Sequence, residues 1–294
     1  MRDVEWPTLA LLLAVYALWA LATTWAAAIW LPLGILLTTL AIAQHSSLTH
    51  EVLHGHPFRN QRLNEATIWP CLGLFVPYAR FRDTHLAHHH DALLTDPYDD
   101  PESNYLDPVV WARLPHIARA VLRFNNTLLG RVTVGPMVGM IVFWRGDWRA
   151  IRAGDIAIRR SWLWQLAAIA PVLAWVWASP MPVWAYAIAA YGAMSLLKIR
   201  TFLEHRAHDR ASGRTVVIED RGPLALLFLN NNYHVVHHMH PKTAWYLLPR
   251  LYAQNKAHYL GRNDGYVYRN YAQIFRRYFL RAKDPVAHPL WPRP

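Results

Sequence analysis

Two adjacent apolar runs near the start of the chain, at 8–30 and 31–49, contain no charged residue. A second pair lies at 162–178 and 181–203, and the later run is charge-free as far as Leu197. The hydrocarbon core of a bilayer is about 30 Å thick, so about 20 helical residues cross it. Two pairs of such runs are hard to bury in a soluble protein. We therefore predict an all-α integral membrane protein with four transmembrane helices in two hairpins.

The composition agrees with a membrane protein that has a large water-facing part. Hydrophobic residues make up 54% of the 294 residues and charged residues only 17%, against about 25% charged in an ordinary globular chain. The mean hydropathy is nevertheless only +0.05, so the apolar residues are concentrated in segments. With Cys71 as its single cysteine, the chain cannot be a disulfide scaffold, and it fits a reducing compartment.

The positive charges indicate the orientation of the hairpins. Neither hairpin tip carries Lys or Arg, whereas the polar segments 50–160 and 204–294 are rich in arginine. Cytoplasmic loops carry an excess of Lys and Arg, so both segments and both termini are expected in the cytoplasm. We expect 1–294 to form one membrane domain, with the polar segments as a helical cytoplasmic cap.

The net charge of +11 is then explained by topology and by attraction to anionic membrane lipids. No nucleic-acid-binding motif accompanies it, so no nucleic-acid partner is expected. Two shorter apolar stretches, Thr67–Ala79 and Leu128–Trp144, are interpreted as interfacial or re-entrant helices. The stretch 271–281 mixes aromatics with arginines and fits either a membrane-surface helix or an ordinary amphipathic surface helix.

Histidines are the strongest chemical signal, because twelve of the 17 fall in three short clusters in the predicted cap or at its border. Within each cluster, several are spaced three or four residues apart, which places them on one face of a helix. The spaced members are His50 and His54, then His85, His88 and His89, and then His234, His237 and His238.

These eight imidazoles predict a metal site. They exceed the four ligands of one tetrahedral zinc and suffice for two metals with open positions. Imidazole suits iron, zinc, copper or nickel, so the ligand type does not choose the metal. His205, just beyond the fourth predicted span, is a candidate ninth ligand, and His208 is a weaker one. The remaining clustered histidines are interpreted as supporting or structural: His45, His56, His90 and His240.

Metal-bound histidines usually donate their second ring N–H to an acceptor. Five carboxylates near the clusters are candidates for that role: Glu51, Asp83, Asp91, Glu204 and Asp209. The acidic, turn-rich loop Thr95–Ser103 is interpreted as purely structural.

The three clusters, read as H-x(3,4)-H, H-x-x-H-H and H-x-x-H-H, resemble the histidine boxes of the membrane fatty acid desaturase and hydroxylase superfamily of non-haem di-iron oxidases. The resemblance implies two iron ions held by the eight histidines, with oxygen as co-substrate. In the stearoyl-CoA desaturase branch an extra histidine beyond the fourth span completes the ligands, and His205 looks like its counterpart. That branch has an asparagine where this chain has Thr201, and Asn230, Asn231 or Asn232 are candidates to substitute for it.

The resemblance implies oxidation of a C–H bond in a lipid acyl chain, with desaturation as the first expectation. Hydroxylation, ketolation and decarboxylation are alternatives within the superfamily, and the segment from Pro241 to Pro249 is also similar to carotenoid ketolases and bacterial acyl desaturases. One cysteine cannot form a fused rubredoxin, so a separate electron carrier such as a ferredoxin is expected. Alternatives of other classes are a membrane zinc hydrolase and a metal transporter or sensor.

Overall fold

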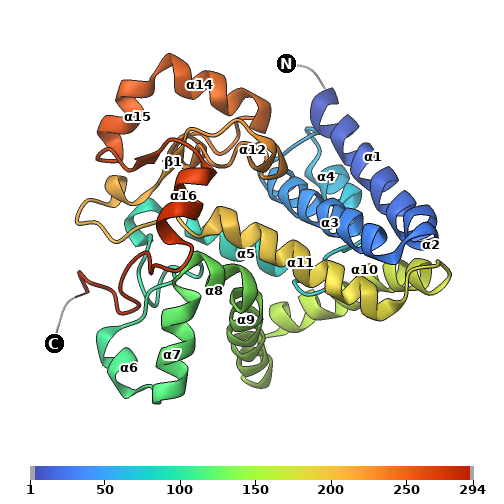
Figure 1. The fold of residues 1–294 in the computed structure, drawn as a ribbon, viewed down its shortest axis with the longest axis horizontal. Helices are drawn as coiled ribbons and strands as arrows, with labels where there is room; N and C mark the ends of the chain where they lie inside the picture. The colour runs from blue at the N-terminus through green and yellow to red at the C-terminus, as the bar shows by residue number, and fades with distance from the viewer. Residues whose placement is uncertain (1–3, 292–294) are drawn as a thin grey trace. The chain divides into compact units, whose positions relative to one another are not determined.

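The computed structural model describes residues 4–291, and these are mostly helical (Figure 1). The chain forms two compact units, each built from two separate stretches of sequence. Unit 1 comprises the described residues up to Arg82 together with Met137–Leu197. Unit 2 comprises Asp83–Pro136 together with the described residues from Lys198 onward. The expectation of a single domain stays a prediction.

Unit 1 contains the long apolar helices. Three helices, α5, α9 and α11, contain residues of both units, because the chain passes from one unit to the other within them. Its elements are α1 (Trp6–Leu21), the π-helix η1 (Ala22–Ala26), α2 (Ala27–Ile29), α3 (Leu31–Leu53), α4 (Gln61–Thr67), α5 (Tyr78–His88), α9 (Gly135–Arg152), α10 (Ile156–Trp177) and α11 (Val183–Thr201).

Unit 2 consists of short helices and one small sheet. Its elements are the 3-10 turn η2 (Asp91–Leu93), α6 (Pro108–Arg113), α7 (His116–Asn125), α8 (Leu128–Thr133), the 3-10 turn η3 (Ala211–Arg214), β1 (Val217–Ile218), α12 (Pro223–Leu227), α13 (His234–Met239), the 3-10 turn η4 (Trp245–Leu247), α14 (Leu248–Gln254), α15 (Lys256–Arg262), β2 (Val267–Tyr268) and α16 (Tyr271–Tyr278).

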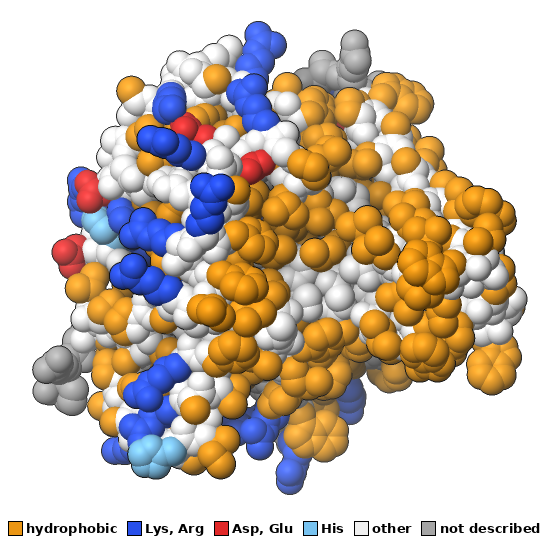
Figure 2. All heavy atoms as spheres, in the orientation of Figure 1, with side chains coloured by type: hydrophobic (Ala, Val, Ile, Leu, Met, Phe, Trp, Pro, Cys, Tyr) orange, Lys and Arg blue, Asp and Glu red, His pale blue; other side chains and the backbone are white. Residues whose placement is uncertain are grey.

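The first predicted hairpin is present as two helices, Trp6–Ile29 and Leu31–Leu53, each long and apolar enough to cross a membrane. The chain reverses at Trp30, where the two helices pack so closely that a Cβ on Gly34 would lie 2.7 Å from the Cα of Ala27. Glycine is therefore required at this turn. Figure 2 shows hydrophobic side chains covering the visible faces of α1 and α2. Helix α3 continues beyond the predicted end at residue 49, and so carries His50 in its last turn.

Among the described residues, these two helices are the ones that meet both the length and the apolarity expected of a membrane span. Helices α10 and α11 contain the second pair of predicted spans and are long enough to cross a membrane. Several of their large apolar side chains are exposed. These are Leu163, Trp164, Leu166, Trp175, Trp177, Val183, Trp184 and Ile188.

The helix expected at Thr67–Ala79 is absent, and that prediction was wrong. Residues 68–77 form a loop between α4 and α5. The loop contains Pro70, Gly73 and Pro77, which disfavour a continuous helix. Polar groups of α10 and α11 bond its backbone: Gln165 Nε2 donates to the Leu74 carbonyl at 2.7 Å, and the Tyr186 hydroxyl donates to the Leu72 carbonyl at 2.9 Å. The second stretch, Leu128–Trp144, is helical as expected, but breaks into α8 and α9 before Pro136.

Unit 2 departs slightly from the all-α prediction. Strands β1 and β2 pair in parallel, with Val217 opposite Val267 and Ile218 opposite Tyr268. Val217 belongs to a buried apolar cluster, which also includes Val235 and Val236 of α13 and therefore anchors the third histidine box. Helix α16 buries its apolar residues, Tyr271, Ile274 and Tyr278, within the unit. The apolar face of α16 therefore packs inside unit 2, and the choice between a membrane-surface helix and an ordinary surface helix for 271–281 stays a prediction.

Candidate metal centre

The second and third histidine boxes come together inside unit 2. His85 and His88 lie in the last turn of α5, and His89 follows directly. His234, His237 and His238 lie in the short helix α13. His205 lies in an extended stretch after α11, where it forms an isolated bridge with Thr215. All seven side chains are buried or half-buried.

Three of these histidines form one group of convergent nitrogens, defined here as the first group: His85, His89 and His237. The Nε2 atom of His89 lies 3.0 Å from that of His85 and 3.2 Å from that of His237. Residues four apart at the end of α5 meet one residue of α13, so the helical spacing seen in the sequence does place the rings together.

The other four histidines form the second group: His88, His205, His234 and His238. Their ligand atoms lie within 4.8 Å of one another. The Nε2 atom of His205 is 2.8 Å from that of His88 and 3.1 Å from that of His234. The two groups adjoin, because the rings of His89 and His238 stack with centroids 4.4 Å apart.

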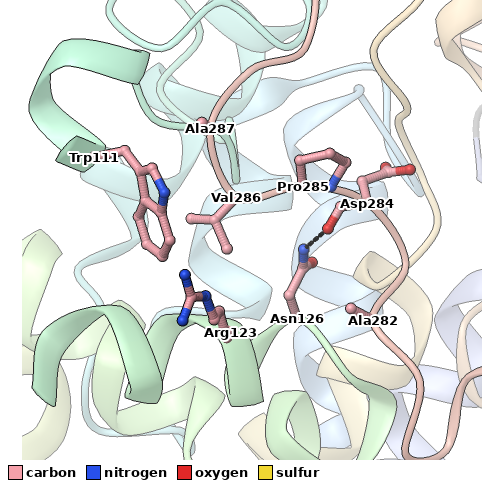
Figure 3. Close-up of a pocket in the computed structure, with 8 residues that line it drawn as sticks. All are labelled: Trp111, Arg123, Asn126, Ala282, Asp284, Pro285, Val286 and Ala287. Carbon is pink, nitrogen blue, oxygen red and sulfur yellow. Dashed lines mark hydrogen bonds between the residues drawn. The ribbon is translucent and has the colours of Figure 1, made fainter. Parts of the chain in front are cut away.

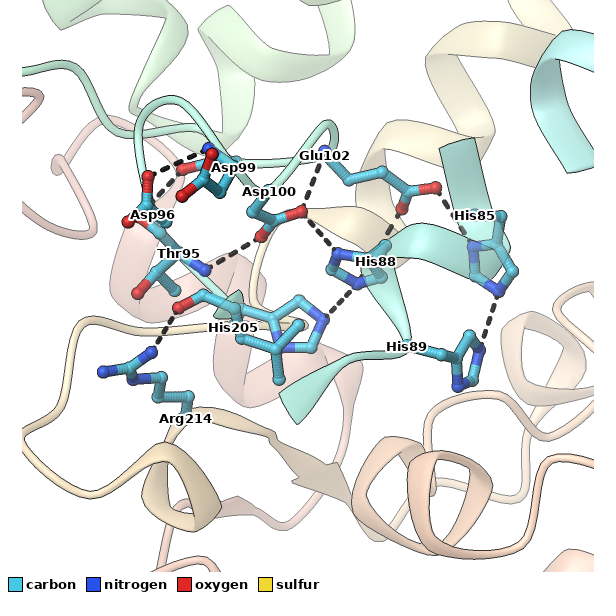
Figure 4. A network of polar contacts seen from close by, with 12 residues as sticks. His85, His88, His89, Thr95, Asp96, Asp99, Asp100, Glu102, His205 and Arg214 are labelled. Carbon is cyan, nitrogen blue, oxygen red and sulfur yellow. Dashed lines mark hydrogen bonds and ion pairs between the residues drawn. The ribbon is translucent and has the colours of Figure 1, made fainter. Parts of the chain in front are cut away.

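Carboxylates and an amide hold the opposite nitrogens of three rings, and Figure 4 shows the two carboxylates, Asp100 and Glu102, beside His88 and His85. His88 Nδ1 donates to Asp100 Oδ1 at 2.7 Å, and His85 Nδ1 donates to Glu102 Oε1 at 3.0 Å. His234 Nδ1 donates to Asn231 Oδ1 at 3.1 Å. With the Nδ1 proton directed outward in this way, the Nε2 lone pair is left to face the centre of each group, as in a metal ligand.

The contacts between nitrogens fit a bound cation better than an empty network. A ring nitrogen offers either one proton or one lone pair. His205 Nε2 faces two other Nε2 atoms, and so does His89 Nε2. At least one contact in each group therefore lacks a complementary hydrogen bond, which is costly in a buried site. A metal ion at the centre of each group would accept all of these lone pairs.

Burial and nearby charge determine which rings are ready to ligate. Burial alone would lower the pKa of His88, but the charges of Glu102 and Asp100 outweigh it and raise that pKa to about 9. Burial and the neighbouring imidazoles hold the pKa values of His205 and His234 well below the ordinary 6.5. His205 and His234 are therefore unprotonated near neutral pH, whereas His88 would have to release a proton in order to bind a metal.

The first box lies in unit 1, at the end of α3. His50 occupies the last turn of the helix and His54 caps it, with ring centroids 4.9 Å apart. Both side chains are buried. The predicted sharing of one helix face is confirmed for this pair.

Four further histidines make contacts outside the two groups. His45 bonds the Tyr16 hydroxyl at 3.1 Å, and His56 bonds Glu5 at 2.8 Å. His208 pairs with Asp264 at 3.1 Å on the surface and does not belong to either group of convergent nitrogens. His240 packs near the ring of Tyr259.

The acidic loop Thr95–Ser103 does more than the structural role that the sequence predicts for it. It supplies both Asp100 and Glu102, the carboxylates that hold His88 and His85. The sequence does contain a sign of this role, because two carboxylates lie in a loop with prolines directly after a histidine box. Asn231 was considered only as a substitute for a water-mediated ligand, yet it holds His234 directly.

The five carboxylates predicted for this role have different surroundings. Glu204 comes within 3.8 Å of His234 Nδ1, but bonds Arg200 more closely at 2.9 Å. Asp83 and Asp209 are exposed, Glu51 is buried in α3, and the side chain of Asp91 lies outside the described part of the structure.

Comparison with known proteins identifies the family of the chain. The model of the fatty acid desaturase family matches residues 23–270. The chain belongs to this family. It is therefore an oxidoreductase, and neither a zinc hydrolase nor a metal transporter.

Two curated relatives are similar over most of the chain. A beta-carotene ketolase of Paracoccus sp. (strain N81106 / MBIC 01143) is 29% identical over 248 residues, which cover 81% of this chain and 86% of the relative. A beta-carotene ketolase of Paracoccus sp. (strain PC1) is 28% identical over 228 residues, covering 75% of this chain and 74% of the relative. Membership of this family of membrane enzymes, with two candidate spanning helices, supports association with a membrane.

Proposed function

We propose that this protein is an oxygen-dependent di-iron oxidase that breaks C–H bonds of a membrane lipid, with fatty acyl desaturation as its reaction. The observation that carries the proposal is the pair of adjoining imidazole groups in unit 2, whose outward nitrogens are held by Asp100, Glu102 and Asn231. A metal site built from neutral imidazoles, with carboxylates behind them, matches the chemistry that the family performs.

The proposed ligand set contains nine histidines. The second group has four members in unit 2 and the first group has three. His50 and His54 are the ligands that the sequence pattern adds, and we assign them to the first group because it has fewer members. The full set is His50, His54, His85, His88, His89, His205, His234, His237 and His238.

Iron is the proposed metal because the reaction is a redox reaction, for which zinc has no accessible oxidation state. Bound iron would supply the oxygen activation that breaking an unactivated C–H bond requires. In desaturation, oxygen, two electrons and two protons remove two hydrogen atoms from the chain and leave two water molecules. The protein's residues hold the rings in place and keep their Nε2 lone pairs available.

The proposed substrate is a lipid acyl chain, and the proposed location is the inner membrane of a bacterium. The exposed apolar side chains on α10 and α11 support a second membrane hairpin beside the first. The arginine-rich polar segments support a cytoplasmic position for the termini and the metal centre.

We further propose that a separate electron carrier, such as a ferredoxin, delivers the two electrons. Basic residues on and beside α14 and α15 include Lys242, Arg250, Lys256 and Arg262, and an acidic carrier would bind such a surface fastest at low salt. Purified protein should form no product from oxygen and lipid until a reductant is added. Turnover without any reductant would refute this requirement.

Lipid analysis tests the reaction. Cells that express the protein should accumulate lipids lacking two hydrogen atoms per chain, and cells that express His85→Ala should not. Iron near two atoms per purified chain and dependence on oxygen should accompany this product. A gain of one oxygen atom would indicate a hydroxylase instead, and an unchanged product in the His85→Ala cells would refute the assignment of the site.

Ketolation is a second candidate function, because both relatives described above are beta-carotene ketolases. This reaction replaces two hydrogen atoms of a methylene group by one oxygen atom. Expression in cells that accumulate beta-carotene, with His85→Ala as the control, separates the two candidates. A ketone-bearing carotenoid with unchanged acyl chains would favour ketolation over desaturation.

A further inference from the structure

Helix α7 of unit 2 presents its apolar stripe outward. Ile117, Val121 and Phe124 are spaced four and three residues apart and share one helix face. They are 80%, 40% and 41% exposed. An amphipathic helix normally buries this face in the protein core. In α7, by contrast, no residue is buried. In the preceding helix α6, Val109 and Val110 are exposed as well.

The polar residues of this arm, 108–125, are basic. It contains Arg113, Arg119 and Arg123, and no Asp or Glu. Arg119 and Arg123 are four residues apart and therefore lie on one face, beside the apolar stripe. Arg123 sits 5.5 Å from the ring of Trp111, at a hollow of about 290 Å³ that the C-terminal segment also lines (Figure 3). This stacking holds α6 and α7 together and keeps a positive charge at the arm.

A distant part of the sequence adds to the same surface. Leu129, at the start of α8, donates its N–H to the carbonyl of Phe279 at 2.9 Å, so residues 279 and 280 adjoin the end of α7. Phe279 and Leu280 are 43% and 73% exposed. The flanking arginines Arg276, Arg277 and Arg281 are exposed too. Two segments far apart in the chain thus repeat one combination of exposed apolar residues and arginines.

We propose that these two segments form a membrane-contact surface of unit 2. This surface consists of Val109, Val110, Ile117, Val121, Phe124, Phe279 and Leu280. Its apolar side chains enter the head-group region of an anionic bilayer, while the flanking arginines pair with lipid phosphates. Arginine and apolar side chains on adjacent faces of a short helix suit an anionic lipid surface, and the absence of acidic residues from 108–125 removes the repulsion that such a surface would otherwise exert.

Spin labelling of the full-length protein in vesicles tests the proposal. Cys71 is the single cysteine, so Cys71→Ser provides a background in which nitroxide labels are placed at 117, 121 and 124. A label at 123, which is exposed on the basic face, is the matched control. In vesicles that contain phosphatidylglycerol, labels on the stripe should collide with oxygen several-fold more, relative to a water-soluble nickel complex, than the label at 123. Retained iron content shows that each labelled variant is folded.

Two results would overturn the proposal. If the stripe labels are as accessible to the nickel complex as the label at the exposed position 123, the stripe of α7 faces water. If they are shielded from both reagents, another protein surface covers the stripe. The role of the arginines has its own test. In vesicles that contain phosphatidylglycerol, the double variant Arg119→Gln, Arg123→Gln should place the label at 121 no deeper in the bilayer than it lies in vesicles of phosphatidylcholine alone. If the depth of this label is the same in both kinds of vesicle, with and without the two arginines, anionic lipid has no role.

Discussion

The Asp100→Asn substitution tests how far the acidic loop controls metal binding. Asp100 is buried and accepts three hydrogen bonds. His88 Nδ1 and the Glu102 N–H donate to Oδ1, at 2.7 and 2.9 Å, and the Thr95 N–H donates to Oδ2 at 2.8 Å. Asparagine has nearly the same shape but only one acceptor oxygen, so it cannot satisfy all three donors.

Either orientation of the asparagine amide disturbs the site. If its oxygen faces His88, the amide NH₂ opposes the N–H of Thr95. If the amide is flipped, His88 must accept at Nδ1 and carry its proton on Nε2, which then cannot ligate a metal. Loss of such a supporting contact typically lowers metal affinity 10- to 100-fold, which corresponds to about 1.4–2.7 kcal/mol.

The assay is iron per chain after equilibration with increasing concentrations of a chelator that buffers free metal. Because Asp100 contacts only the second group, Asp100→Asn should lose about half of its iron at chelator concentrations that leave the wild type fully loaded. Asp96→Asn is the matched control, since Asp96 bonds the backbone of Tyr98 and Asp99 in the same loop. Wild-type iron retention in Asp100→Asn, or an equal loss in Asp96→Asn, would refute the reasoning.

Three further predictions concern the ligands, the support of unit 1 and the metal itself. His85→Ala should abolish product formation, whereas His56→Ala should leave a measurable fraction, because His56 bonds Glu5 instead of converging with the ligands; product analysis in cells distinguishes them. Arg80→Met removes the cationic partner of the buried Asp147 carboxylate, 2.9 Å away, and leaves it the Trp162 indole N–H, so it should destabilise unit 1 by about 3–5 kcal/mol. Arg82→Met breaks a more exposed pair and should cost less than about 1 kcal/mol, so equal shifts in thermal unfolding in detergent would contradict this ranking. Removing metal with a chelator should lower the unfolding midpoint of the wild type and less so that of His85→Ala, since only a bound ligand stabilises the folded state.

Helices and box spacing could be read from the sequence because both depend on neighbours along the chain. The charge-free runs predicted α1 to α3 closely, since helix length across a bilayer follows directly from the number of apolar residues. The i, i+3 and i+4 spacing of His85, His88 and His89 predicted rings on one side of α5, because helical geometry is local.

Other assignments failed where a residue's role depends on a distant partner. The stretch 68–77 is apolar enough for a membrane-associated helix. It forms a loop instead, because the side chains of Gln165 and Tyr186 donate hydrogen bonds to its carbonyl groups. Its own residues carry no sign of those donors, which lie about a hundred positions later in the chain. Likewise, the loop carboxylates gain their role only because the chain folds Asp100 and Glu102 back onto the end of α5.

By itself the sequence determined the two helices of the first hairpin, the candidate ligand type and the spacing within each box, because these are properties of short stretches and of helical periodicity. Only the tertiary structure decided that His205 joins His88 and His234, that Asp100 and Glu102 hold the rings of His88 and His85, and that α7 turns its apolar stripe outward. The direction in which a ring nitrogen or a helix face points is set by long-range packing, and periodicity along the chain carries no information about the partner it meets.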